Sequence, residues 1–98
     1  MRAAWWYRLR GYRILATNCW LAGAELDVVA RRGRTVVFCE VKSKGGDAFG
    51  DPLEMVDERK VSRLHRAAQA WLRDDALEVR FDVIAVRGRR LEHVPNAF

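Results

Sequence analysis

Two acidic residues and a lysine form the pattern D-x12-E-V-K, whose charged positions are Asp27, Glu40 and Lys42. Both acids lie inside short apolar segments, LDVV at 26–29 and VVFCEV at 36–41. Charged side chains are rare in such surroundings unless they are paired or bind a ligand. Two carboxylates and an ammonium group brought together suit a divalent cation and a reactive phosphate. The pattern therefore suggests metal-assisted hydrolysis of a phosphodiester.

A β-hairpin would bring these residues together, and the alternation of side chains along its strands shows whether they would point to the same face. Side chains alternate along a strand, so Glu25 and Asp27 share one face, as do Glu40 and Lys42. A two-residue turn at Arg32-Gly33 would pair residue 25 with residue 40 and direct all four charged side chains to one side. A four-residue turn keeps this arrangement, whereas a three-residue turn sends Glu40 to the opposite face.

The chemistry expected of this hairpin depends on a metal. Hard carboxylate oxygens favour Mg²⁺ or Mn²⁺ over zinc, and Asp27 and Glu40, with the Val41 carbonyl, would hold the ion. The metal would lower the pKa of a bound water and polarise the phosphodiester. Lys42 would orient that water or offset negative charge in the transition state. Glu25 is either an auxiliary ligand or the solvent-facing start of its strand.

The pattern of the chain predicts the order α-β-β-β-α-β-β. The expected elements are a helix at 2–10, strands at 12–16, 25–31 and 35–42, a helix that begins at Asp51 or Asp57 and ends near 73, and strands at 81–86 and 91–94. The glycine-rich stretch 43–51 is expected to be a loop that contacts substrate, with simple flexibility as the alternative. An ordinary hairpin with solvent-facing charges is the alternative to the site. Apolar residues on both faces of 36–41 argue against it, because they are typical of a central strand.

Composition indicates one globular domain at 1–98 with a polyanionic partner. Half of the 98 residues are hydrophobic, the net charge is +5 and the pI is about 9.9, which favours nucleic acid, although a basic but inert surface gives the same numbers. Cys19 and Cys39 have no metal-ligand spacing, and Cys39 is expected to be a buried small residue. No signal peptide or transmembrane run is evident, so we expect a cytoplasmic protein without membrane contact.

Basic and aromatic residues could extend the site. Lys60, Arg63 and Arg66 follow helical spacing and would contact phosphates, as would Lys44 in the glycine-rich loop; a solvated helix face is the alternative. The tryptophans could stack on bases. The four tryptophans are Trp5, Trp6, Trp20 and Trp71. Trp71 fits the core face of its helix, while Trp5 and Trp6 would cover the sheet or a dimer contact. The histidines, His65 and His93, are assigned no catalytic role.

Longer segments carry a family resemblance. They are GYRILATN at 11–18, AELDVVARRG at 24–33, VVFCEVKSK at 36–44, FGDP at 49–52, RKVSRLHRAAQAWL at 59–72, RFDVIAV at 80–86 and EHVPNAF at 92–98. In these segments the chain resembles the YraN-like branch of the PD-(D/E)XK nuclease superfamily, near the archaeal Holliday-junction resolvases. The resemblance implies a restriction endonuclease-like α/β fold, with an αβββαβ core and a mixed sheet flanked by helices. It also implies Asp27, Glu40 and Lys42 as the catalytic positions.

The chain departs from that family at two places. Members usually have a longer N-terminal helix with a glutamate near its start, and here no Asp or Glu precedes Glu25. The usual Gly-Gly-Glu is Gly23-Ala24-Glu25, which keeps the acid. One possible metal ligand therefore has no counterpart in this sequence.

The sequence thus predicts a Mg²⁺-dependent endonuclease that cleaves DNA, with branched or structured DNA as the substrate suggested by the resemblance. A non-catalytic nucleic-acid-binding module with the same fold is the alternative. RNA is a second candidate substrate, because no base-reading element is evident. A resolvase-like reaction would require two sites and thus a homodimer.

Overall fold

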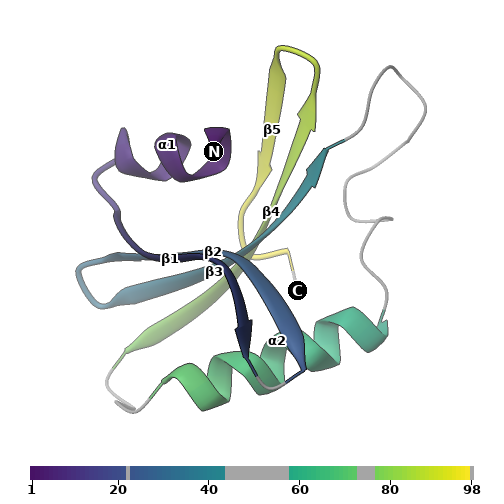
Figure 1. The fold of residues 1–98 in the computed structure, drawn as a ribbon. Helices are drawn as coiled ribbons and strands as arrows, with labels where there is room; N and C mark the ends of the chain where they lie inside the picture. Colours follow the sequence, from purple (N-terminus) through teal and green to yellow (C-terminus); the bar gives the residue numbers. More distant parts are fainter. Residues whose placement is uncertain (22, 44–57, 73–76, 98) are drawn as a thin grey trace.

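The computed structural model describes residues 1–21, 23–43, 58–72 and 77–97, in which five strands form one sheet with a helix on either side (Figure 1). The elements are α1 (Arg2–Arg8), β1 (Arg13–Leu21), β2 (Ala24–Arg32), β3 (Thr35–Ser43), α2 (Glu58–Trp71), β4 (Glu78–Arg87) and β5 (Arg90–Val94). The predicted α/β fold is confirmed, with the order αβββαβ followed by one further strand. The expected loop from residue 44 onward and both candidate helix starts, Asp51 and Asp57, lie outside the described residues.

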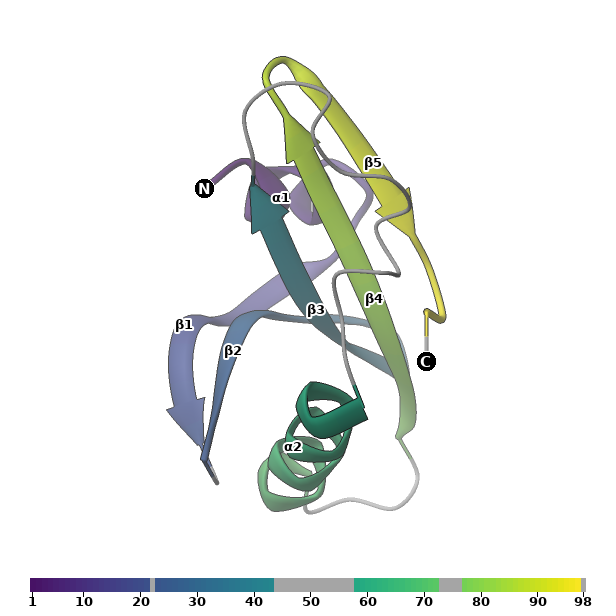
Figure 2. The ribbon, with the colours of Figure 1, turned by 90° about the vertical axis from the view of Figure 1, so that its right-hand side faces the viewer.

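A parallel strand pair joins the two halves of the sheet. The strand order is β1-β2-β3-β4-β5, and β3 runs parallel to β4, while all other neighbours are antiparallel. Parallel strands need a crossover connection, and this one contains α2. Figure 2 shows α2 on the side of the sheet toward which β1 and β2 curl. In the described part of the chain, neither helix is long and apolar enough to cross a membrane.

Two apolar clusters cover the two faces of the sheet. The first lies under α1 and includes Tyr7, and the second lies under α2 and includes Leu64. Strand β3 contributes to both, with Cys39 in the first cluster and Phe38 in the second. Its apolar residues are therefore buried on both faces, which confirms the prediction of a central strand at 36–41. Cys39 is a buried small residue as expected, and burial raises the pKa of its thiol.

The β2–β3 turn lies one residue later than the sequence predicts. Arg32 pairs with Thr35, so the two turn residues are Gly33 and Arg34, not Arg32 and Gly33. Gly33 has a φ of 61°, and a left-handed first turn residue is what favours glycine in type II′ hairpins. The sequence alone does not distinguish this turn from one with glycine in second place. Because the turn still has two residues, the parity is preserved, although the predicted pairs are wrong.

Strand β1 is longer than expected and contains a bulge. The sequence predicts a strand at 12–16, whereas β1 continues well beyond it. Its register against β2 shifts between Ile14 and Ala16, which accommodates one extra residue. Pairing resumes after the bulge and places Trp20 opposite Glu25. The extension thus brings an aromatic side chain next to the predicted acidic positions.

Asp82 is fully buried, and several donors surround its carboxylate. Its Oδ2 accepts a 2.6 Å hydrogen bond from Tyr7 Oη and lies 2.8 Å from His93 Nε2. Arg80 donates to both carboxylate oxygens, and the backbone amide of Asn96 donates to Oδ1. Burial alone would raise the pKa of Asp82, but the hydrogen bonds that it accepts, above all from Arg80, lower it. The buried carboxylate of Asp82 therefore connects α1, β4 and β5 through its hydrogen bonds.

Replacing Tyr7 by Phe should remove one hydrogen bond to this carboxylate and leave the ring packing intact. Hydrogen bonds to charged groups contribute about 1.5–3 kcal/mol, so we expect the free energy of unfolding to fall by that amount. Urea unfolding followed by tryptophan fluorescence measures the change. Tyr12→Phe is the matched control, because Tyr12 Oη accepts a bond from Arg80 at 3.1 Å in the same network. An equal loss of unfolding free energy in Tyr12→Phe would show that the hydrogen bond from Tyr7 to Asp82 contributes no more than the bond between Arg80 and Tyr12.

Candidate active site

Glu40 lies near the end of β3 on the face covered by α2, and its side chain is only 2% exposed. Two ammonium groups contact one of its carboxylate oxygens. Lys42 Nζ lies 3.3 Å from Glu40 Oε1, and Lys60, in the first turn of α2, forms an ion pair with the same oxygen. Glu40 and Lys42 therefore share a face, as strand alternation requires, and the crossover helix adds a second lysine.

Asp27 reaches the same end of β3 from the neighbouring strand. The regular pairing of β2 with β3 ends just before it. Beyond that point the backbone amide of Val41 donates a 2.8 Å hydrogen bond to Asp27 Oδ2. A side-chain carboxylate thus connects the two strands where the backbone ladder stops. Extending the register by one residue sets Asp27 across from Glu40, in place of Glu25 as the sequence predicted.

The surroundings of Asp27 disfavour its negative charge. Burial raises the pKa of this carboxyl from 3.8 to about 6; the Val41 hydrogen bond opposes the rise, and the charges of Glu40 and Glu25 add to it. Burial also opposes the charge of Lys60, but its side-chain hydrogen bonds, first to Glu40, and the negative charges of Glu40 and Asp27 together outweigh burial and raise the pKa of the Lys60 ammonium. The negative charge gathered here is therefore only partly compensated.

A divalent cation fits these residues. Glu40 Oε2 is buried and has no hydrogen-bond partner within the described residues, and the neighbouring Asp27 is in an environment that penalises its charge. The two carboxylates supply the hard oxygen ligands that Mg²⁺ and Mn²⁺ prefer. No group of three His, Cys, Asp or Glu side chains that could hold a metal occurs in the described ranges. Two carboxylates are nevertheless enough for Mg²⁺, which usually retains several waters.

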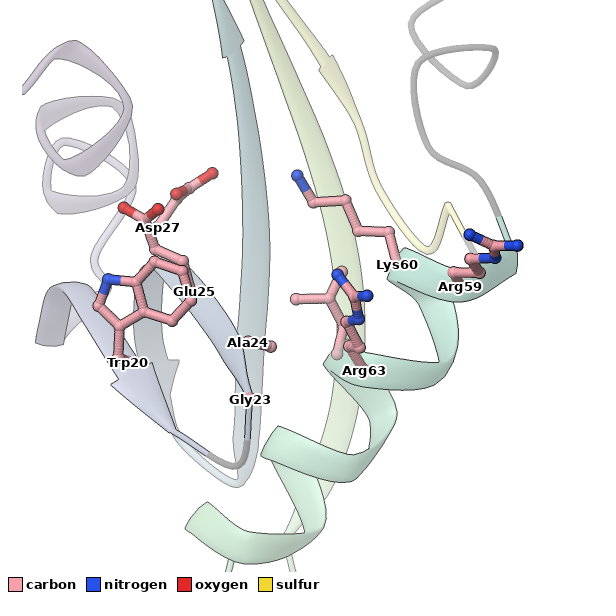
Figure 3. Close-up of a pocket in the computed structure, with 9 residues that line it drawn as sticks. Trp20, Gly23, Ala24, Glu25, Asp27, Arg59, Lys60 and Arg63 are labelled. Carbon is pink, nitrogen blue, oxygen red and sulfur yellow. The ribbon is translucent and has the colours of Figure 1, made fainter.

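A cavity of about 370 Å³ opens beside these residues, between the adjoining ends of β1 and β2 and the first half of α2 (Figure 3). The wall formed by the sheet carries Glu25 and Asp27. The wall formed by the helix carries Arg59, Lys60 and Arg63. An acidic wall therefore faces a basic wall across the cavity.

The predicted phosphate-binding residues fall into three groups. Lys60 and Arg63 line the cavity, whereas Arg66 is exposed and is not one of the described residues that line it. Lys44 lies outside the described residues. Arg59 also lines the cavity and was not predicted, although its spacing of one helical turn from Arg63 was a signal in the sequence. The pairing of Lys60 with an acid of β3 was not predicted either, because that contact depends on how the crossover returns to the sheet.

Comparison with known proteins gives a family. The family model described as "Uncharacterised protein family UPF0102" matches residues 1–86. A UPF0102 protein of Serratia proteamaculans is 44% identical over 93 residues, which cover 90% of this chain and 80% of that protein. One from Syntrophotalea carbinolica is 44% identical over 103 residues (98% and 84% covered), and one from Acidothermus cellulolyticus is 42% identical over 106 residues (90% and 80% covered). The matched region contains Asp27, Glu40 and Lys42.

Asp27→Asn should stabilise the metal-free protein above pH 6. A carboxyl whose pKa rises from 3.8 to about 6 on folding costs stability that is fully felt above the folded pKa and disappears as the pH falls to the unfolded one. Two pKa units correspond to at most about 3 kcal/mol, and residual solvent screening reduces this to about 1–2 kcal/mol.

Urea unfolding in EDTA at pH 8, 6 and 4 measures this difference. We expect a gain in the free energy of unfolding at pH 8 that shrinks toward pH 4. Glu78→Gln, at an exposed carboxylate near the far end of β4, is the matched control and should show little change. A destabilised Asp27→Asn at pH 8, or a difference independent of pH, would contradict the electrostatic account.

Proposed function

Because the chain belongs to the uncharacterised protein family UPF0102, whose description states no activity, we propose a function from its residues: metal-dependent hydrolysis of phosphodiester bonds in DNA. The observation that carries the proposal is the meeting of Asp27, Glu40 and Lys42 at one end of the central strand, where a buried oxygen of Glu40 has no hydrogen-bond partner among the described residues. Burial disfavours the two carboxylate charges, which a cation would compensate, and a bound phosphate would give Lys42 a second anionic partner.

The place of the acids in the fold supports the same proposal. They lie on β2 and β3 of an αβββαβ chain, at the D-x12-E-V-K positions. In both respects the chain resembles the PD-(D/E)XK nucleases, and in its longer segments the YraN-like branch. This resemblance favours phosphodiester hydrolysis over other reactions of a metal and two carboxylates.

In the proposed reaction, a water oxygen loses a proton to solvent and bonds to phosphorus, the bond from phosphorus to the leaving sugar oxygen breaks, and that oxygen takes up a proton from solvent. Lys42 Nζ is partly exposed beside Glu40, where it would orient the water or stabilise the charge that develops on the phosphate. In the metal-free protein burial raises the pKa of Asp27 to about 6, so mild acid would protonate this ligand and weaken metal binding. Asp27 and Glu40 would hold Mg²⁺ or Mn²⁺, which supplies an activated water and polarises the phosphodiester.

Charge favours a nucleic acid as the partner. The chain has a net charge of +5, and the helix wall of the cavity presents Arg59 and Arg63 within the same site. Guanidinium groups suit phosphate oxygens because their donors form a planar fork. Branched or structured DNA is the proposed substrate, with RNA as the alternative, and cleavage of two strands of a junction would use two copies of the chain.

One contact favours a second candidate function, a nucleic-acid-binding module without catalysis. The ion pair of Lys60 with Glu40 gives the carboxylate a cationic partner from the chain itself. If that pair is permanent, the site has lost its chemistry and retains only the basic surface. Such a module would bind DNA in a salt-sensitive way and would give no product with any divalent cation.

Cleavage assays separate these candidates. Purified protein should nick supercoiled plasmid and branched DNA with Mg²⁺ or Mn²⁺ and not with EDTA. Asp27→Asn, Glu40→Gln and Lys42→Ala should each lower the rate by about 100-fold or more, as expected for groups that act on the reacting phosphate. Glu78→Gln, prepared identically, should retain the wild-type rate. Cleavage that survives Asp27→Asn would come from a contaminant or another site and would refute the mechanism.

Thermal unfolding tests the metal without requiring activity. Mn²⁺ should raise the melting temperature of the wild type, since a ligand that binds only the folded state stabilises it according to its concentration relative to Kd. Glu40→Gln should abolish most of the shift. Equal shifts in wild type and Glu40→Gln would place the metal elsewhere, and no shift at saturating Mn²⁺ would favour the binding module.

A further inference from the structure

Trp20 differs from the other tryptophans in having an open ring. Trp71 packs against the cluster under α2, as its helical position predicted, and Trp6 lies against a histidine with ring centroids 4.1 Å apart and ring planes tilted by 38°. Trp5 is 57% exposed but lies under the guanidinium of Arg8, 5.1 Å from its ring centroid. Trp20 is 71% exposed, and no other ring or guanidinium from the described residues stacks on it. Such a ring offers a large apolar face to a ligand.

The ring stands at the edge of the cavity beside the candidate active site (Figure 3). Trp20 is directly opposite Glu25 in the β1–β2 ladder, and cross-strand partners project to the same face of a sheet. Trp20, Glu25 and Asp27 therefore form one wall, while Lys60 and Arg63 lie on the other. A ligand in this cavity would touch an aromatic face, carboxylates and cations at once.

These three chemistries match the parts of one nucleotide. An aromatic face stacks on a base regardless of its identity, the carboxylate of Glu25 can accept hydrogen bonds from the N–H groups of a base edge, and Arg63 suits a phosphate. The volume of about 370 Å³ lies at the small end of the range of about 300–1,000 Å³ typical of small-ligand pockets. The cavity thus suits one nucleotide and not a duplex.

We propose that this cavity binds one unpaired nucleotide of the substrate strand, with its base stacked on Trp20 and its phosphate at Arg63. The inference rests on the proposed function, because the adjoining phosphate would be the one presented to Asp27 and Glu40. In a continuous duplex the faces of each base are covered by its neighbours and are unavailable to an aromatic side chain. The substrate class is therefore DNA with a single-stranded segment beside the cleaved bond.

Fluorescence anisotropy in EDTA tests the proposal through binding alone. The probes are a labelled blunt duplex, the same duplex with a single-stranded tail, and the free single strand. Trp20→Ala should weaken binding of the tailed and single-stranded probes by about 5- to 150-fold, the range for one stacked base, and change duplex binding by less than about 2-fold. Trp20→Phe should restore part of the loss.

Trp5→Ala is the matched control, since it removes a comparably exposed ring from α1 and should leave all three affinities unchanged. Unchanged far-UV spectra and melting curves establish that the variants fold. A loss that is equal for all probes, or absent, would overturn the proposal. So would a change in oligomeric state with Trp20→Ala and no change in DNA binding, which would make the ring a protein contact.

The outcomes remain distinct from those of the proposed nuclease. If Trp20→Ala selectively loses single-strand binding and the wild type never cleaves DNA, the nucleotide-binding cavity is supported and the proposed catalysis is refuted. If the wild type cleaves DNA in a metal-dependent way and Trp20→Ala keeps the probe preference of the wild type, the proposed catalysis is supported and the nucleotide-binding cavity is refuted.

Discussion

The parallel pairing of β3 with β4 is the constraint on which the candidate site depends. Strand β3 is an interior strand because it pairs with β4 through nine residue pairs, from Thr35 with Glu78 to Ser43 with Val86. The carboxylate of Glu40 is therefore shielded from solvent. Parallel strands also require a crossover, and the crossover helix here returns Lys60 to Glu40. The burial of Glu40 and its ion pair with Lys60 thus both follow from the parallel pairing of β3 with β4.

Two aspartates, Asp82 fully buried and Asp27 partly buried, differ in the number of donors that their carboxylates meet. Asp82 accepts hydrogen bonds from two side chains and a backbone amide and lies against a histidine, and these contacts lower its pKa despite burial. Among the described residues Asp27 accepts one hydrogen bond, from Val41, and burial together with the charges of two nearby acids raises its pKa. The first is complete within the fold. The second is left with a charge that a ligand can compensate.

The sequence predicted most of the fold because its apolar patterns are local. The shared face of Glu40 and Lys42 follows from alternation along a strand, the two-sided burial of β3 from its continuous apolar run, and the order of the elements from helical and strand periodicities. The turn was misplaced by one residue, since glycine fits either turn position. The length of β1 was missed because its later residues, which include Trp20, lack an alternating pattern. The network around Asp82 could not be predicted, because its partners come from distant parts of the chain.

The unequal burial of the two cysteines gives the protein a natural attachment point for a reporter group. Cys39 lies in the core with a thiol that burial keeps protonated, whereas Cys19 is only partly buried on β1, one residue from Trp20. Thiolates react with alkylating reagents and buried thiols do not. A maleimide dye would therefore label Cys19 in the unmodified chain. Its emission would report events at the rim of the cavity without any substitution in the protein.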